Sequence, residues 1–271
     1  MTKRFYSFSV LLIAVTTGSG LPAPVAAGDF IPHRATYIMN LNTSKPGSGI
    51  SGANGVMVYQ FSDACDGWIV ENRTVLNFNY TEGGQVATTW DFLTWESKNG
   101  LRYRFYMRST RDGQLSDEID GTAVMNKDRT EGEARYDKPE RITISLPEGT
   151  IFPLAHTRKL IEMAKEGKKF FPQIVFDGSG TDGPFEVTAA IGRQMDGAVA
   201  GEISDPLLET MSWSVRMAFF PMEGDTTTPD YEVGLRYHEN GIAQNLVQDF
   251  GSYTLRGWLS KLEPLPKPDC E

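Results

Sequence analysis

Apolar and polar residues alternate along most of this chain in short runs separated by Gly, Asn and Asp. Ala35, Tyr37, Met39 and Leu41 show the pattern, because they share one parity and would lie on one face of a strand. Residues 43–55 are rich in Gly and Ser and are expected to form a loop. Further strands are expected at 55–62, 67–77, 84–96, 101–111, 114–126, 130–136, 140–146, 171–177, 184–193, 212–222, 230–238, 242–250 and 252–262. Together these make about fourteen mostly antiparallel strands, which is typical of an all-β sandwich or barrel.

One stretch departs from this pattern and predicts an α-helix within residues 148–167. Its apolar positions form a narrow stripe made by Leu160, Ile161 and Ala164, with Met163 at the margin. Thr157 is the expected N-cap and Gly167 the expected residue after the C-cap, so the helix proper should span 154–167. A single helix among strands must lay its stripe against the sheet, and we therefore expect it either to cap a barrel mouth or to fill the interior.

Three dipeptides favour tight hairpin turns, namely Asn99-Gly100, Asp112-Gly113 and Asn240-Gly241. The first predicts that Trp95 pairs with Arg104 and that Asp91 pairs with Arg108. The second would bring Asp117 against Arg108 from the other side. These registers favour an antiparallel meander.

Arg102, Arg104 and Arg108 share one face of the first hairpin and could bind an anionic ligand. The same registers give these arginines cross-strand partners, including a cation–π contact between Arg104 and Trp95. We therefore favour a solvated, internally paired face over a ligand site.

The N-terminus has the pattern of a signal peptide. Lys3 and Arg4 precede an apolar run at 5–15, and Val25-Ala26-Ala27 fits a small-x-small cleavage site. The run is too short to span a bilayer, so we expect an exported protein that does not span the membrane. Cleavage near Ala27 would leave residues 28–271 as a single β domain. The formal net charge of −9 argues against nucleic acid as a partner.

Cys65 and Cys270 are the only two cysteines in the sequence. In an exported protein a lone pair is most simply a structural disulfide. A redox pair is the alternative, but the sequence has no C-x-x-C spacing next to a helix start. We therefore expect a disulfide that closes a loop of 205 residues and holds the C-terminal tail.

Sequence motifs for catalysis or metal binding are weak. His33, His156 and His238 lack metal-ligand spacing, and His238 is expected at the surface beside a turn. The segment 177–183 has oxygen ligands at alternate positions, but Thr188 stands where an EF-hand needs Glu, so we expect a Gly-rich connection. No Gly-x-Ser-x-Gly elbow is present. We expect a non-enzymatic protein without metal or cofactor, with hydrolase activity as the remaining enzymatic alternative.

The start of the predicted helix is the candidate binding site. His156, Thr157, Arg158 and Lys159 gather there, although cations oppose the favourable macrodipole arrangement at this end. Free N–H groups beside two cations could hold an anion. The alternative is that these side chains point into water.

Several motifs together resemble the cell-envelope integrity protein B (EipB) family of alphaproteobacteria. They are LPEGTIFP at 146–153, AHT at 155–157, FFxxxVFDG at 170–178, SDACDGW at 62–68 and the near-terminal Cys270. The resemblance implies a periplasmic protein with a spiral-like, broken β-barrel, a central helix and a disulfide joining Cys65 to Cys270. It also implies a part in maintaining the cell envelope under stress and a likeness in shape to lipoprotein-carrier folds, but it carries over no catalytic residue.

Two functions follow from these observations. The first is a scaffold or adaptor whose open β surface binds an envelope protein. The second is a carrier or sensor that binds a lipid, a lipoprotein or a cell-wall fragment in a concave β surface. An apolar cavity of a few hundred Å³ would favour the carrier, on the order of a typical ligand pocket. A filled interior with an unpaired edge strand would favour the adaptor.

Overall fold

Fourteen antiparallel strands form one curved sheet in the computed structural model, which describes residues 30–196, 202–223 and 227–270. The predicted signal peptide lies outside the described residues. The strands are β1 (His33–Ser44), β2 (Ile50–Asp63), β3 (Gly67–Tyr80), β4 (Gln85–Ser97), β5 (Arg102–Arg111), β6 (Gln114–Met125), β7 (Gly132–Lys138), β8 (Ile142–Leu146), β9 (Phe170–Val175), β10 (Phe185–Met195), β11 (Ser212–Pro221), β12 (Tyr231–His238), β13 (Ala243–Asp249) and β14 (Tyr253–Pro264). A helix, α1 (Pro153–Lys165), and a short 3₁₀ helix, η1 (Pro206–Leu208), complete the described elements.

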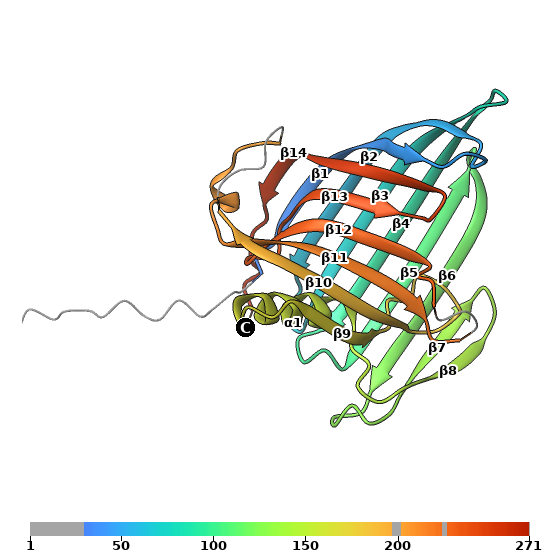
Figure 1. Cartoon of the computed structure of the whole chain (residues 1–271). Helices are drawn as coiled ribbons and strands as arrows, with labels where there is room; N and C mark the ends of the chain where they lie inside the picture. The colour runs from blue at the N-terminus through green and yellow to red at the C-terminus, as the bar shows by residue number, and fades with distance from the viewer. Residues whose placement is uncertain (1–29, 197–201, 224–226, 271) are drawn as a thin grey trace, which may run out of the picture.

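The sheet is an open barrel. Its strand order is β8-β7-β6-β5-β4-β3-β2-β1-β14-β13-β12-β11-β10-β9, so the first and last strands of the chain pair at its centre. The two ends of the sheet are β8 and β9, and these strands do not pair with each other (Figure 1). Within the described residues, an isolated parallel bridge between Ile151 and Val175 and a hydrogen bond from Gln173 Nε2 to the carbonyl of Gly149 link the segment after β8 to β9. The predicted all-β, broken-barrel fold with one helix is confirmed.

The predicted loop at 43–55 is wrong in its second half, because β2 already begins at Ile50. Glycine in this strand serves close packing rather than a turn. A Cβ atom on Gly55 would lie 1.9 Å from the carbonyl oxygen of Val75 on β3, so only glycine fits there.

The register predicted from the Asn99-Gly100 turn is confirmed, since Trp95 pairs with Arg104 and Asp91 with Arg108 across β4 and β5. The predicted approach of Asp117 to Arg108 is wrong. An irregularity between Ser109 and Thr110 shifts the β5–β6 register by one residue. Asp117 therefore lies opposite Ser109, and Arg108 lies opposite Glu118.

Helix α1 begins earlier than the sequence predicts. Its N-cap is Phe152, with Pro153 in the first turn, and not Thr157. The hydroxyl of Thr157 instead donates to the carbonyl of Pro153. The C-terminal prediction is confirmed, because Gly167 has a φ of 75° and Lys168 N–H donates to the carbonyl of Met163 in a Schellman motif.

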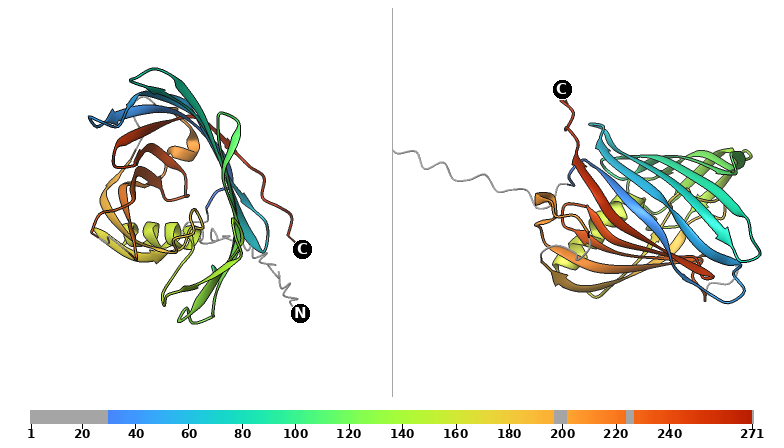
Figure 2. Two further views of the ribbon diagram at one scale, coloured as in Figure 1. Left: turned by 90° about the vertical axis from the view of Figure 1, so that its right-hand side faces the viewer. Right: turned by 90° about the horizontal axis from the view of Figure 1, so that it is seen from above.

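The predicted stripe of α1 is buried: Leu160 is 0% exposed, and Ile161 and Ala164 are each 4% exposed. These side chains belong to the larger of two core clusters, and α1 packs beside β9 and β10. Figure 2 shows α1 on the inner side of the curved sheet. Burial of the apolar stripe holds the helix there, as expected for a lone helix among strands.

A second core cluster lies under β5, β6, β7 and β8. Phe152, just before α1, and Phe176, just after β9, also belong to it, and both are 0% exposed. The Phe152 ring lies 5.1 Å from the ring of Tyr103 on β5. These aromatic contacts join the two ends of the open sheet through side chains rather than through a strand ladder.

Candidate functional site

The start of α1 is capped by a side chain from the sheet. Both oxygens of Glu96, on β4, accept hydrogen bonds from α1: Oε2 from Leu154 N–H at 2.8 Å and Oε1 from Ala155 N–H at 2.9 Å. Glu96 is 3% exposed. Burial raises its pKa to about 7, against the opposing effect of the two helix N–H groups and of Arg129 and Arg158 nearby.

The hypothesis of an anion site at His156, Thr157, Arg158 and Lys159 assumes free N–H groups at this end of the helix. The structure places these residues inside the first turns of α1 rather than before it. Two N–H groups of the first turn already donate to Glu96. A carboxylate of the protein itself therefore holds the position expected for an external anion.

The four predicted residues have different surroundings. His156 is 5% exposed, and its ring stacks on Phe171 at 5.4 Å. Burial lowers the pKa of His156 to about 4, and Lys159 adds to the shift, so the imidazole is neutral at pH 7. The guanidinium of Arg158 lies 5.6 Å from the ring of Phe30. Arg158 and Lys159 line a small open cleft with Lys98, whereas His156 does not.

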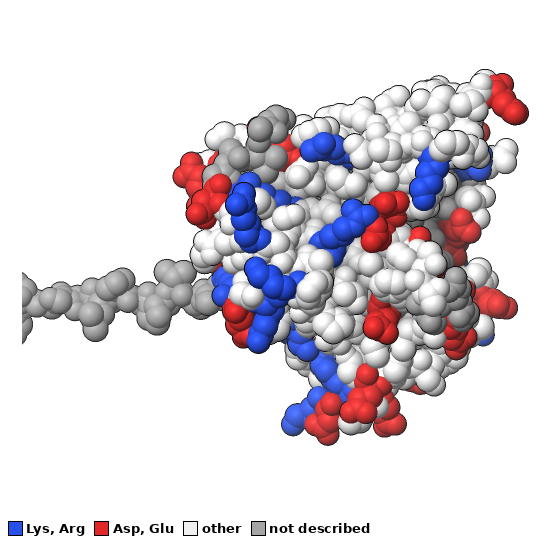
Figure 3. Space-filling view, in the orientation of Figure 1, with Lys and Arg blue, Asp and Glu red and all other residues white. Residues whose placement is uncertain are grey.

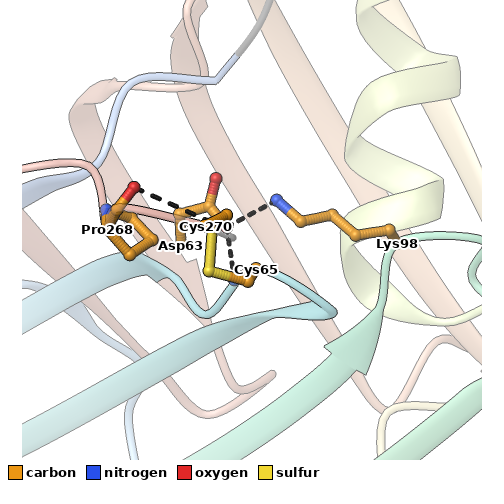
Figure 4. Close-up of a disulfide and its surroundings, with 5 residues drawn as sticks. All are labelled: Asp63, Cys65, Lys98, Pro268 and Cys270. Carbon is orange, nitrogen blue, oxygen red and sulfur yellow. Dashed lines mark hydrogen bonds and ion pairs between the residues drawn. A yellow bond between two sulfur atoms is a disulfide. The ribbon is translucent and has the colours of Figure 1, made fainter.

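Cys65 and Cys270 form a disulfide with a Cα–Cα distance of 5.7 Å (Figure 4). It joins the turn between β2 and β3 to the tail that follows β14. The Asp63 carboxylate beside it accepts from Cys65 N–H at 2.9 Å and pairs with Lys98 Nζ at 2.6 Å. Lys98 also lies 3.0 Å above the ring of Trp68. The tail is thus fixed to the part of the sheet that carries Glu96.

On the arginine face of β5, Arg102 and Arg104 contact Trp95, whereas the ion pair expected between Arg108 and Asp91 is replaced by one between Arg73 and Asp91. The guanidinium carbons of Arg102 and Arg104 lie 5.9 and 5.2 Å from the ring of Trp95. Asp91, opposite Arg108, forms its ion pair with Arg73 on β3 at 3.4 Å. This arrangement agrees with the predicted solvated face.

Tyrosine hydroxyls form hydrogen bonds to the backbone of the Gly-rich segment after β9. Tyr103 donates to the carbonyl of Asp177 at 2.9 Å, and Tyr136 donates to the carbonyl of Gly180 at 2.9 Å. The Asp177 carboxylate accepts from Ser179 and from Tyr231. No group of three or more His, Cys, Asp or Glu side chains in the described part of the chain could hold a metal ion.

The other two histidines are also buried. His238, expected at the surface, is 0% exposed, and its ring nitrogens contact Gln244 at 2.8 Å and Thr210 at 3.1 Å. His33 lines an interior cavity of about 150 Å³ with Tyr37, Tyr59 and others. This volume is below the roughly 300–1,000 Å³ of typical ligand pockets.

A groove of about 980 Å³ lies at the open seam of the sheet. On one side it is bounded by Ile144, Ser145 and Pro147, at the end of β8. On the other side lie the segment 181–184 and residues next to β11 and β12, namely Pro221, Met222, Glu223 and Asp230. The groove therefore borders an end strand of the sheet, and we take this seam as the candidate functional site.

Sequence reasoning missed both Glu96 and this seam. Glu96 sits in an alternating strand, and its helix partner is 58 residues away, so no local pattern reveals the contact. The seam depends on which strands end the sheet, which is a property of the whole topology. Within the described ranges, no helix has the length and apolar character that a membrane span requires.

Comparison with known proteins agrees with this architecture. The model of the EipB-like family matches residues 24–266. The chain is 32% identical over 253 residues to the cell envelope integrity protein EipB of Brucella abortus, covering 90% of this chain and 88% of that protein. It also matches a crystal structure from Brucella abortus, a β-barrel-like protein of the domain of unknown function DUF1849. That match has a TM-score of 0.82 at 31% identity and covers 89% of this chain and 100% of the other. The chain belongs to the EipB-like family.

Proposed function

We propose that this protein supports cell-envelope integrity from the periplasm, as a non-enzymatic adaptor that binds an envelope protein at the open seam of its sheet. The name of the Brucella abortus relative supports the envelope role. A disulfide and the N-terminal signal pattern support an oxidising, exported location. We propose further that residues 28–271 fold as one domain.

The main support for the adaptor role is that the sheet ends at β8. This strand has a sheet neighbour on one side only and borders the large groove. An edge strand beside a groove is a surface that protein partners recognise by strand addition. The cavity of about 150 Å³ is smaller than a typical ligand pocket, which gives the carrier alternative less support.

Photocrosslinking in cells tests the adaptor role. A photoreactive amino acid at Thr143, exposed on β8, should give a discrete crosslinked protein in the native envelope. The matched control is Thr122, which is exposed on β6, a strand with neighbours on both sides. Equal crosslinking from both positions, or none from Thr143, would contradict the adaptor role at this seam.

The envelope role is tested separately by deletion of the gene. The deletion strain should lose resistance to a membrane-disrupting detergent, and the full chain should restore it. A chain that lacks residues 1–27 should not restore resistance, because it would stay in the cytoplasm. Restoration by that chain would argue against a periplasmic site of action.

A further inference from the structure

The two ends of the sheet are protected very differently. β9 has Pro172 within it, Ile151 bridges to its Val175, and α1 packs beside it. β8 has the sequence ITISL, without Pro, Gly or a charged residue. Proline, charge and cover are the usual means by which proteins block an edge strand. β8 is five residues long, has neither proline nor charge within it, and exposes Thr143 and Ser145, so its outer edge remains available for pairing.

The alternation of backbone hydrogen bonds along β7 shows which N–H and C=O groups of β8 face the open edge. Asn126 N–H donates to the carbonyl of Glu131, which continues the β6–β7 ladder by one pair. Alternate residues of β7 therefore bond to β6 and the others bond to β8, including Ala134 opposite Ile144. It follows that the N–H and C=O groups of Thr143 and Ser145 point away from β7 and toward the open edge.

The side chains of β8 alternate between the core and the solvent. Leu146 belongs to the second core cluster, and Ile142 and Ile144 pack against it. Thr143 and Ser145 are exposed. The strand is thus anchored to the core by one set of residues, while the other set presents backbone groups to a partner.

The groove beside this edge is acidic. Its described lining residues include Asp182, Glu223 and Asp230, and none of those described is Lys or Arg. Among the described residues, no ion pair joins these three carboxylates to a basic side chain. On the face seen in Figure 3, acidic side chains dominate the lower right, where β7 and β8 lie in Figure 1. A partner strand with positive charge would complement this groove.

We propose that an extended segment of the partner, rich in Lys or Arg, adds to β8 as a further strand and places basic side chains in this groove. This proposal rests on the adaptor function above and names the chemistry of its partner. The partner segment must be an extended polypeptide, because only another main chain can pair with the row of N–H and C=O groups along this edge. The carboxylates favour a basic partner, and they disfavour a second copy of this chain, which would bring a second acidic groove against the first.

The test uses the purified exported protein and short synthetic peptides. A peptide of alternating valine and lysine should bind, as measured by fluorescence anisotropy, and should slow hydrogen exchange at the Thr143 and Ser145 amides. A peptide of alternating valine and glutamate should not bind. The valine–lysine peptide with its alternate amides N-methylated keeps the side chains and loses the donors, and it should bind at least about tenfold more weakly.

Two variants at one position separate the backbone from the side chain. Thr143→Pro removes the outward N–H and should weaken peptide binding about tenfold, whereas Thr143→Val keeps this donor and should bind like the wild type. Both melting temperatures are measured, and the N-methylated peptide provides a result that is independent of any folding defect in Thr143→Pro.

Equal binding of the methylated and unmethylated peptides, or of the two charge types, would overturn the proposal. Self-association of the wild type that Thr143→Pro abolishes would overturn it in favour of a second copy. Absence of peptide binding together with a crosslink from Thr143 in cells would overturn the basic-strand proposal while leaving the adaptor function standing. Absence of both would overturn both.

Discussion

Glu96, on β4, accepts a hydrogen bond of 2.8 Å from the backbone N–H of Leu154 at the start of α1. The contact spans 58 positions of sequence and gives the helix a cap that its own N-cap residue, Phe152, cannot provide. A carboxylate at this end also complements the helix macrodipole. The sheet thus fixes where the lone helix begins.

Replacement of this carboxylate should destabilise the fold. Glu96→Ala leaves the N–H groups of Leu154 and Ala155 without an acceptor in a buried place, and we expect a loss of about 1–3 kcal/mol. Urea denaturation at pH 8 measures it. Glu133→Ala, which removes a solvent-accessible ion pair with Arg135, is the control and should cost less than about 0.5 kcal/mol. Similar losses for the two variants would show that Glu96 does not cap the helix.

Protonation of the buried His156 should lower the stability of the fold in acid. Because burial lowers its pKa to about 4, below the ordinary 6.5, its contribution is present above pH 6.5 and is lost as the pH falls through about 4. The loss should be on the order of 3 kcal/mol. His156→Phe keeps the ring packing and should flatten the fall of the melting temperature between pH 6.5 and 4. An unchanged slope would place the acid sensitivity elsewhere.

The contribution of Glu96 to stability should change with pH in the opposite direction to that of His156. Its pKa is raised to about 7 from an ordinary 4.5, so its contribution is present below pH 4.5 and is lost as the pH rises through about 7. Glu96→Gln should therefore gain relative to the wild type as the pH rises from 4.5 to 8. A constant difference in the free energy of unfolding across this range would contradict the buried environment of Glu96.

The disulfide should contribute chiefly to stability. It closes a loop of 205 residues, for which the chain-entropy estimate is about 5 kcal/mol as an upper value. Cys65→Ser should lower the free energy of unfolding by roughly 2–5 kcal/mol and make the C-terminal tail sensitive to protease. Cys65→Ser/Cys270→Ser should match the single variant. Unchanged stability of both would remove the structural role.

Two glycines of one loop provide a matched pair. Gly178 has a φ of 70°, and a Cβ atom there would lie 2.5 Å from the ring of Phe105, whereas a Cβ on Gly180 would meet nothing within 4 Å. Gly178→Ala should cost about 2–4 kcal/mol through strain and a clash in the second core cluster. Gly180→Ala should stay within about 0.5 kcal/mol in the same thermal melt. Equal effects would mean that the loop does not hold Gly178 against Phe105.

Local patterns predict this fold well and its function poorly. Alternation identifies the strands, and the Asn99-Gly100 turn fixes a register, because both depend on neighbouring residues. The failures have identifiable causes. An irregularity between Ser109 and Thr110 displaces Asp117. Gly55, counted as part of a loop, instead packs closely against β3 within a strand. Glu96 takes the capping role assigned to Thr157. The open edge at β8 depends on the order of all fourteen strands, which no local segment encodes.

The most direct test of the adaptor account is complementation of the deletion strain by the two Thr143 variants. At equal periplasmic levels, Thr143→Val should restore detergent resistance, and Thr143→Pro should not, because only the first keeps the outward N–H of β8. Restoration by both variants would contradict the claim that this edge binds the partner.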